Sequence, residues 1–343
     1  MLLSIAAILI LSVSPTVAAA TLGAPIGKAP VSSDPPLSPA PYAAYSGDYS
    51  YVAAGAAMRD QGYGNITLRW TGTLFKSYLV WAYINYTATD PQGTFNGQTI
   101  TGTFQSTDSS PCWGYGNITV FAADVTSLVV NGLNNLKNFP SGVTNGADPW
   151  SEGTYVAPLM EGASLIVIYT PTSSVTNQVY VYTGTYTNAN PDNELVNGGY
   201  LTSTFDHGST IATSANTTFI VSDGQFTGNT AAWDGVQIDA NAFPGSDNRT
   251  STAEWTDGNL WDTRTYTVPV MSGSTQDNAT IGSTDDCLTW AAQVLSFPSL
   301  APIGPAPPSG VPQFGMPMAV VAISFFGLAL LAKKKSSPSS KAS

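Results

Sequence analysis

The stretch Gly162-Ala163-Ser164-Leu165-Ile166-Val167-Ile168-Tyr169, followed by Thr170-Pro171, decides the fold of this chain. It is a continuous apolar run of strand length, rich in β-branched residues, and it opens on glycine and closes on proline. Such a run predicts a central β-strand that is buried on both faces.

The segments on both sides of this run predict further strands, separated by short turns rich in glycine and asparagine. Asn96-Gly97 lies between strand-forming residues and predicts a tight hairpin. Residues 124–129 fit a short helix or the end of a strand, and residues 131–161 predict a long loop, which is often a binding surface. The expected strands are 68–70, 78–86, 178–184, 199–205, 217–222, 236–238, 265–268 and 287–297. The predicted fold is all-β, a β-sandwich of jelly-roll type.

One hexapeptide, Gly-Tyr-Gly-Asn-Ile-Thr, occurs at residues 62–67 and again at 114–119. The sequences that follow the two copies diverge. We therefore interpret them as two similar strand starts and not as the unit of an internal repeat.

Both ends of the chain differ in composition from its middle. Residues 1–20 predict a secretory signal peptide, with an N-terminal membrane anchor as the alternative, and residues 316–332 are apolar enough for one transmembrane helix. Three lysines follow that run and predict a cytoplasmic end. The predicted order is a signal peptide (1–20), a Pro/Ala/Ser-rich linker (21–42), a β-sandwich ectodomain (43–297), a Pro-rich stalk with a sorting motif (298–315), the transmembrane helix (316–332) and a basic cytoplasmic tail (333–343).

Charge is sparse and strongly acidic outside the tail. Four of the eleven basic residues lie after residue 332, so the exported part carries seven basic and 22 acidic residues, a net charge of −15. This charge argues against nucleic acid or anionic lipid as a partner. The expected location is the extracellular face of the cell membrane, within the envelope.

The chain has only two cysteines, Cys112 and Cys287. An even pair in an exported protein predicts one disulfide bond, with two buried free thiols as the alternative.

Six short motifs occur in a fixed order along the ectodomain. They are Val80-Trp81-Ala82-Tyr83, Phe95-Asn96-Gly97, Pro111-Cys112-Trp113, Ala123-Asp124-Val125-Thr126, the stretch 162–169 and Asp286-Cys287-Leu288-Thr289-Trp290. Their succession resembles a family of archaeal, especially methanogen, cell-surface proteins built on a domain of unknown function. The resemblance implies an extracellular β-sandwich and supplies no catalytic residues.

The C-terminal region resembles a second pattern, the archaeal sorting signals of PEF-CTERM type that archaeosortases process. Pro312-Gln313-Phe314-Gly315 precedes the apolar span and the lysines. Gln313 stands where these signals usually carry an acid, and the tail continues to Ser343. Two outcomes remain open: cleavage with lipid replacement, or a permanent membrane anchor.

Catalytic residues are not indicated by the sequence. His207 is the one histidine, which gives no Ser/His/Asp signature and excludes the usual Cys/His zinc sites. Glycoside hydrolysis needs two positioned carboxylates, and the sequence does not pair Glu152, Glu161, Glu194, Glu254 or the aspartates.

Two kinds of site are compatible with the polar turns. Calcium is the one ion considered, at Asp192, Glu194, Asp257 and Asp262, although ordinary solvated turn residues explain these positions better. No other cofactor is expected. Six Asn-x-Ser/Thr sequons are candidates for N-glycosylation, at Asn65, Asn85, Asn117, Asn216, Asn248 and Asn278.

The sequence leads to three hypotheses on function. The first is a non-enzymatic structural or adhesive protein of the cell surface, with envelope proteins or glycans as partners. The second is a carbohydrate-binding module, which predicts exposed aromatic rings among Trp113, Trp150, Trp233, Trp255 and Trp261, whereas tryptophans buried between sheets are the ordinary explanation. The third is a surface glycoside hydrolase.

Overall fold

The computed structural model describes residues 37–298, apart from positions 60, 86–90, 111–114, 143–156, 174–175, 189–198, 225–227, 249–258 and 284–286. This part is all-β, which confirms the predicted class, and no helix in it is long and apolar enough to cross a membrane. Its strands are β1 (Ala43–Gly47), β2 (Ser50–Ala57), β3 (Gly64–Leu68), β4 (Gly72–Asn85), β5 (Gln92–Phe95), β6 (Gln98–Thr101), β7 (Thr103–Ser110), β8 (Tyr115–Asp124), β9 (Gly132–Lys137), β10 (Leu159–Pro171), β11 (Asn177–Thr187), β12 (Gly199–Asp206), β13 (Ser214–Ser222), β14 (Thr230–Trp233), β15 (Val236–Asp239), β16 (Trp261–Pro269), β17 (Gln276–Ser283) and β18 (Thr289–Pro298).

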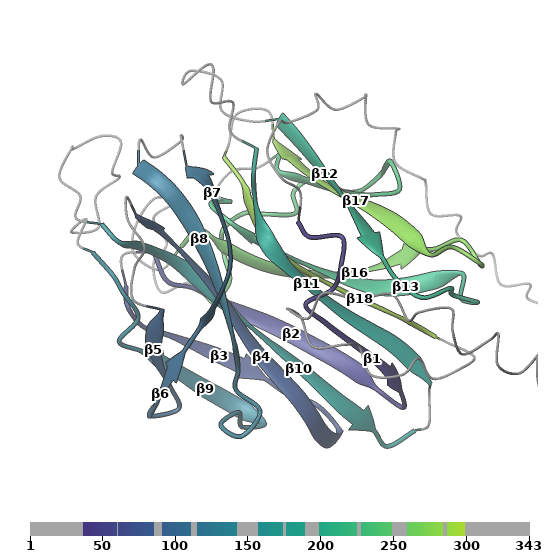
Figure 1. Ribbon diagram of the computed structural model, residues 1–343, viewed down its shortest axis with the longest axis horizontal. Coiled ribbons are helices and arrows are strands. Elements are labelled where there is room, and N and C mark those ends of the chain that lie inside the picture. Colours follow the sequence, from purple (N-terminus) through teal and green to yellow (C-terminus); the bar gives the residue numbers. More distant parts are fainter. Residues whose placement is uncertain are drawn as a thin grey trace, which may run out of the picture. The chain divides into compact units, whose positions relative to one another are not determined.

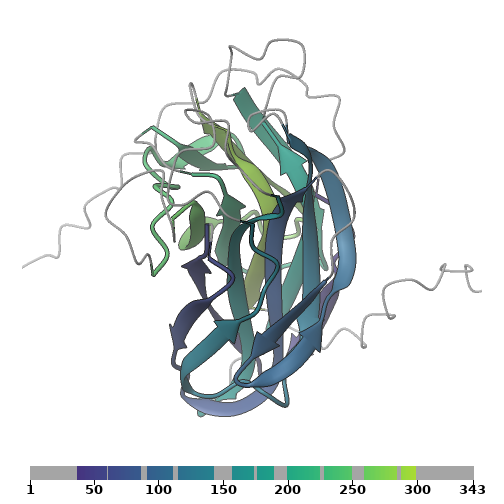
Figure 2. The ribbon, with the colours of Figure 1, turned by 90° about the vertical axis from the view of Figure 1, so that its left-hand side faces the viewer.

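The strands form four antiparallel sheets that pack as layers (Figure 1). Two inner sheets have five strands each, in the orders β2-β10-β4-β8-β7 and β1-β11-β18-β13-β16. Two outer sheets have four strands each, β3-β9-β5-β6 beside the first inner sheet and β12-β17-β14-β15 beside the second. Figure 2 views the layers from the side of β5, β6 and β9.

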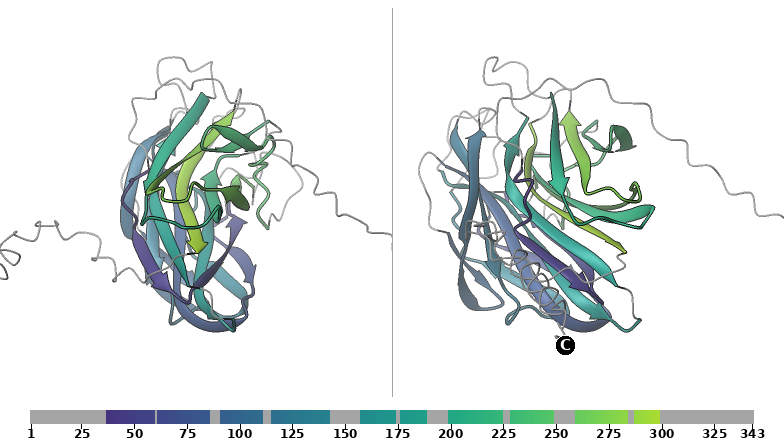
Figure 3. Two further views of the ribbon diagram at one scale, coloured as in Figure 1. Left: turned by 90° about the vertical axis from the view of Figure 1, so that its right-hand side faces the viewer. Right: turned by 45° about the vertical axis from the view of Figure 1, so that its right-hand side comes forward.

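The strand order of the first half is repeated in the second. With β7 set aside, the strands of β2–β10 are numbered 1 to 8 along the chain, and β11–β18 are numbered in the same way. Both inner sheets then have the order 1-8-3-6, and both outer sheets have the order 2-7-4-5. The blue strands of the first half and the green strands of the second lie on opposite sides of the right panel of Figure 3. The chain thus contains one sheet topology twice, and we call residues 50–171 the first half and residues 177–298 the second half.

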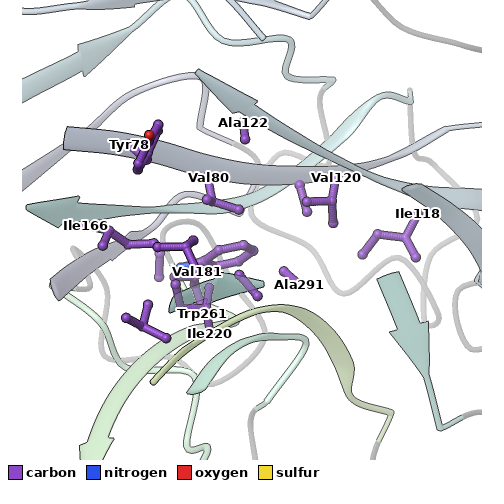
Figure 4. Packing of buried hydrophobic residues seen from close by; sticks show 14 of the residues in the cluster. Tyr78, Val80, Ile118, Val120, Ala122, Ile166, Val181, Ile220, Trp261 and Ala291 are labelled. Carbon is purple, nitrogen blue, oxygen red and sulfur yellow. The ribbon is translucent and has the colours of Figure 1, made fainter. Parts of the chain in front are cut away.

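The inner strands are buried on both faces because each inner sheet lies between two other sheets. β10 contains the stretch 162–169, and every residue from Leu159 to Ile168 is buried. It lies between β2 and β4, which confirms the predicted central strand. Even-numbered side chains such as Ile166 and Ile168 pack between the two inner sheets, while Leu165 and Val167 pack against the outer sheet. Figure 4 shows the core shared by the two halves.

The outer strands alternate buried and exposed residues, as expected for strands with one face in water. β3 shows this pattern along its five residues, and β12 shows it in its second half. The predicted hairpin at Asn96-Gly97 is confirmed, because it joins β5 to β6 with positive φ values of 49° and 82°. The two copies of the hexapeptide lead into β3 and β8, which belong to different sheets.

The prediction of a loop over residues 131–161 is wrong for part of that range. Residues 132–137 form β9, and its burial is carried partly by Asn134, an asparagine that the apolar pattern did not count. The side-chain amide of Asn134 is satisfied by the backbone of Val130 and by the side chain of Asn96. The strand expected at 68–70 ends at Leu68. Of residues 124–129, Asp124 ends β8, as one of the two alternatives predicts, and 126–128 form a turn.

The N-terminal strand β1 joins the second half although β2, next along the chain, belongs to the first. β1 pairs with β11 from Ala43 opposite Val181 to Gly47 opposite Asn177. An aromatic cluster fastens it to the first half: the hydroxyls of Tyr45 and Tyr78 are hydrogen-bonded, and the ring centroids of Tyr45 and Phe75 are 5.3 Å apart.

Candidate functional site

An open groove of about 580 Å³ lies on the first half, at the end of the β3–β9 pair. Five of its eight lining residues carry an amide side chain, an amine or an exposed phenol. We call it the amide groove, and its lining residues are Gly62, Tyr63, Gly64, Asn65, Asn135, Leu136, Lys137 and Asn138. Its volume falls in the range of about 300–1,000 Å³ that is usual for small-ligand sites.

The backbone of the amide groove depends on two glycines. A Cβ on Gly62 would lie 2.5 Å from the carbonyl oxygen of Phe139, whose N–H donates to the carbonyl of Gly62 at 3.0 Å. A Cβ on Gly64 would lie 3.0 Å from Met58 Cγ. The close approach at Gly62 is therefore possible only without a side chain, because the opposing atom belongs to the backbone, whereas a Cβ at Gly64 would require a small shift of the Met58 side chain.

The pleat of β3 and β9 decides which side chains reach the groove. Ile66 and Leu136 turn into the core, and Asn65, Asn135 and Lys137 point outward and are exposed. Asn65 lies directly opposite Asn135. Side chains in such a pair have Cβ atoms about 4.5–5.5 Å apart, so the two amides face one ligand-sized space.

Tyr63 stands at the edge of the amide groove with 56% of its surface exposed. An exposed ring beside several amides is the chemistry of a carbohydrate contact, since the ring packs on sugar C–H groups and the amides bond to hydroxyls. None of the groove's lining residues is acidic. The groove therefore offers binding groups without the carboxylate pair that glycoside cleavage requires.

A loop of the second half touches the same strand of the groove. Asn248 has a left-handed φ of 43°, and its Nδ2 donates to the carbonyl of Asn65. The adjacent carbonyl of Asp247 accepts a 2.7 Å hydrogen bond from the N–H of Ala57 in β2. The groove is thus supported by both halves.

Two aspartates with enclosed carboxylate oxygens lie at this loop, Asp247 within it and Asp262 near the start of β16. Asp262 accepts hydrogen bonds from the N–H of Gly245 at 2.6 Å and from Arg264 Nη2 at 2.8 Å, yet burial raises its pKa to about 6. Burial of the Asp247 carboxylate, with the neighbouring charge of Asp262, raises the Asp247 pKa to about 7. The residue Asp247 is only half-buried, but its Oδ2 is enclosed.

Asp262 was one of the four calcium candidates. Its carboxylate is occupied by Arg264 and the loop backbone, an arrangement that repels a cation and fixes the loop. Asp192, Glu194 and Asp257 lie outside the described residues. In the part of the chain that the structure describes, no group of three or more acidic, histidine or cysteine side chains could hold a metal ion.

His207 has a buried acidic partner that sequence reasoning missed. Its Nε2 lies 3.0 Å from Oδ2 of Asp277, its Nδ1 lies 2.8 Å from the carbonyl oxygen of Gly208, and its ring packs against Tyr180 and Phe297. Asp277 is in β17, seventy residues away in sequence, and no local signal links the two. The enclosure supports a structural role.

Glu161 is also enclosed, and it forms an ion pair with Arg59 in which both side chains are fully buried. A carboxylate held in this way is a packing element. The other candidate glutamates, Glu152, Glu194 and Glu254, lie outside the described residues.

The six sequon asparagines lie on strands and in one loop. Asn65, Asn117, Asn216, Asn248 and Asn278 are exposed, and Asn85 is half-buried. The amide oxygens of Asn216 and Asn278 accept hydrogen bonds from the hydroxyls of Thr267 and Thr204. These bonds engage the amide oxygens and not the amide nitrogen, which is the atom that is glycosylated.

The predicted tryptophan platform is not formed by its described members. Trp233 and Trp261 are 1% and 0% exposed and belong to two different cores, so neither ring is available to a ligand. Trp113, Trp150 and Trp255 lie outside the described residues. Cys287 is disulfide-bonded, and Cys112 also lies outside the described residues, as do the sorting motif 312–315 and the predicted segments at both ends.

The sequence matches no protein-family model and no curated protein. Solved structures with a partial likeness include dimeric latent PorU from Porphyromonas gingivalis, with a TM-score of 0.26 and 11% identity over 78% of this chain and 27% of PorU. N-glycanase F has a TM-score of 0.21 and 11% identity, over 75% of this chain and 97% of its own. The major capsid protein P2 of bacteriophage PM2 has a TM-score of 0.20 and 10% identity, over 74% of this chain and 100% of its own. TM-scores this low carry no argument on fold or function.

Proposed function

We propose that this chain is a non-enzymatic structural or adhesive protein of the cell surface, with each half forming one jelly roll. The strand orders 1-8-3-6 and 2-7-4-5 support that assignment. Export, C-terminal anchoring, sorting and the resemblance to archaeal surface proteins belong to the same proposal and rest on the sequence.

The observation that carries the proposal is the apolar core between the two inner sheets. Two jelly rolls joined only by a linker would move relative to one another. Here Ile166 and Val80 of the first half and Val181 and Val294 of the second are all completely buried in one cluster. The two halves therefore act as one rigid body, a property suited to an element that bears contacts.

The buried charged groups support contact in preference to catalysis. His207 and Glu161 are enclosed and paired, and the amide groove has no acidic side chain among its lining residues. Trp233 and Trp261 are buried and cannot contact a carbohydrate. Within the described residues, the amide groove is a surface whose amides and exposed ring are suited to binding a sugar.

Intact mass spectrometry of the protein from the native cell surface, with its copy number, tests the proposal. We expect an abundant mature chain that begins near Thr21. A C-terminus near Pro312 would indicate sorting, and retention of residues 316–343 would indicate a permanent anchor. Recovery of the full chain, with Met1 to Ala20 intact, in the cytoplasm would contradict the proposal.

A further inference from the structure

We propose that the amide groove holds the first sugars of an N-linked glycan attached to Asn65 of the same chain. The inference rests on the proposed export of the protein, because only an exported chain meets the glycosylation machinery. It goes further in two respects. It assigns a structural role to the glycan at Asn65, and it identifies that glycan as the ligand of the amide groove.

The position of the acceptor is the first argument. Asn65 is at once a sequon asparagine and a wall of the groove. Its side chain is exposed and points outward from β3, directly opposite Asn135. A sugar joined to Asn65 Nδ2 therefore begins inside the groove.

The lining of the groove is the second argument. Asn135 supplies an amide donor and acceptor for sugar hydroxyls, and Lys137 adds a donor that also favours an acidic sugar. The Nδ2 of Asn138 donates to the Thr94 hydroxyl at 3.2 Å, so Asn138 offers its amide oxygen and its second amide hydrogen. Tyr63, two residues before Asn65, offers a ring with 56% of the residue surface exposed. Aromatic rings of this kind lie against the C–H face of a sugar.

Tethering explains how an open groove could hold a sugar. Open, solvated sites bind free sugars weakly, but a covalently attached ligand has an effective concentration on the order of millimolar. Weak contacts to Tyr63 and Asn135 therefore suffice for substantial occupancy. The same contacts would leave a free sugar mostly unbound.

The second half contains a built-in control. β12 and β17 occupy the places in the second half that β3 and β9 occupy in the first. This pair also carries an exposed sequon, Asn278, which lies opposite Thr204 and accepts its hydroxyl at 2.7 Å. Thr204 is short and offers neither an amide nor a ring, so the residue opposite Asn278 does not provide the contacts that Asn135 provides opposite Asn65.

The experiment compares hydrogen exchange of the glycosylated protein from its native host with that of variants made in the same host. Thr67→Val removes the Asn65 sequon while it keeps Asn65 and a β-branched residue on an exposed position of β3. We expect amides in 62–68 and 132–138 to exchange about two- to tenfold faster in this variant, as for a site filled at one to nine times its Kd. Asn278→Gln, which removes the second sequon at an exposed position and keeps an amide, is the control and should leave the exchange of 199–206 and 276–283 as it is in the wild type.

A second variant keeps the glycan and removes its contact. Tyr63→Ala should retain the sugar on Asn65, seen as an unchanged glycopeptide mass, and should lose the protection at 132–138. Because Tyr63 is largely exposed, this variant is expected to fold.

The outcomes separate the inference from its premise. An unmodified Asn65 with sugars on other sequons overturns the groove assignment and leaves export intact. An Asn65 glycan without any protection of 132–138 also overturns it, as does equal protection by free glycan added to Thr67→Val. Absence of sugar from all six sequons contradicts the premise itself.

Discussion

Oδ2 of Asp108 accepts a 3.0 Å hydrogen bond from the backbone N–H of Thr187, so a buried side chain of β7 satisfies the backbone of β11. Oδ1 of the same carboxylate accepts the N–H of Ser109 at 2.7 Å. Among the strands that the structure describes in the second half, none corresponds to β7, and the packing of β7 beside β11 helps to close one side of the core between the halves. The Asp108 carboxylate thus forms a direct hydrogen bond between the first half and the second half.

Asp108→Ala is expected to lower the free energy of unfolding by about 1–3 kcal/mol, because it leaves the buried N–H of Thr187 without its acceptor. Urea unfolding followed by tryptophan fluorescence measures this. Thr103→Ala, at an exposed position of the same strand, is the control and should cost about 0.5 kcal/mol or less. Equal effects of the two variants would show that the bond contributes nothing specific.

Gly162→Ala is expected to destabilise the protein by about 1–3 kcal/mol, because overpacking forces a rearrangement in a dense core. A Cβ there would lie 2.5 Å from Trp261 Cγ, and the ring belongs to β16 of the other half. The measurement is a double-mutant cycle with Trp261→Leu. Gly162→Ala should cost less in the Trp261→Leu background than in the wild type, and strict additivity would refute the clash.

Stability should depend on pH through Asp247. Its pKa is about 7 in the folded state, and an unfolded aspartate has a pKa of about 3.9, so between these values the folded state binds the extra proton. The contribution of this group is therefore full below about pH 4 and is lost as the pH rises through about 7. Asp247→Asn, which stays neutral, should be more stable than the wild type by about 1 kcal/mol or more at pH 8 and similar at pH 4.

Thermal melts across this pH range check the prediction, with Asp48→Asn at an exposed carboxylate as the control. A difference between Asp247→Asn and the wild type that is the same at every pH would show that the Asp247 carboxylate does not take up a proton on folding.

The predicted disulfide between Cys112 and Cys287 is tested by labelling thiols in the denatured native protein. We expect no labelled cysteine, and two labelled cysteines would refute the bridge. Removing both cysteines should cost roughly 4–5 kcal/mol in the chain-entropy model, because the bridge would close a loop that runs from the first half into the second.

The sequence predicts the all-β class and the central strand well, because burial on both faces leaves a long apolar run at 162–169. It predicts outer strands poorly where polar residues carry the burial, as Asn134 does in β9. It gives no sign of the repeated topology, since the two halves keep a strand order and not a residue pattern. The amide groove is found only in space: β3 brings the first copy of the hexapeptide beside residues 135–138, which the sequence assigns to a loop.

Sites assembled from distant residues are outside the reach of sequence reasoning. His207 and Asp277 meet because β12 and β17 are neighbours, and Asp247 and Asp262 meet because a loop folds back on β16. Neither pair has a spacing that a helix or a single strand would produce. The sequence indicates Asp262 as a calcium ligand. In the structure its carboxylate instead accepts a hydrogen bond from Arg264, two residues further along the same strand.

The place of β1 has a consequence for the order in which the protein is made. Ala43–Gly47 leave the ribosome before any other strand that the structure describes, but their partners at Asn177–Val181 are synthesised only after the whole first half. Until then the backbone of β1 lacks the strand β11 with which it forms its hydrogen bonds, and Tyr45 can contact only residues of the first half, such as Tyr78. The first strand made is thus among the last to be paired, and a chain interrupted before residue 177 exposes it as an open edge.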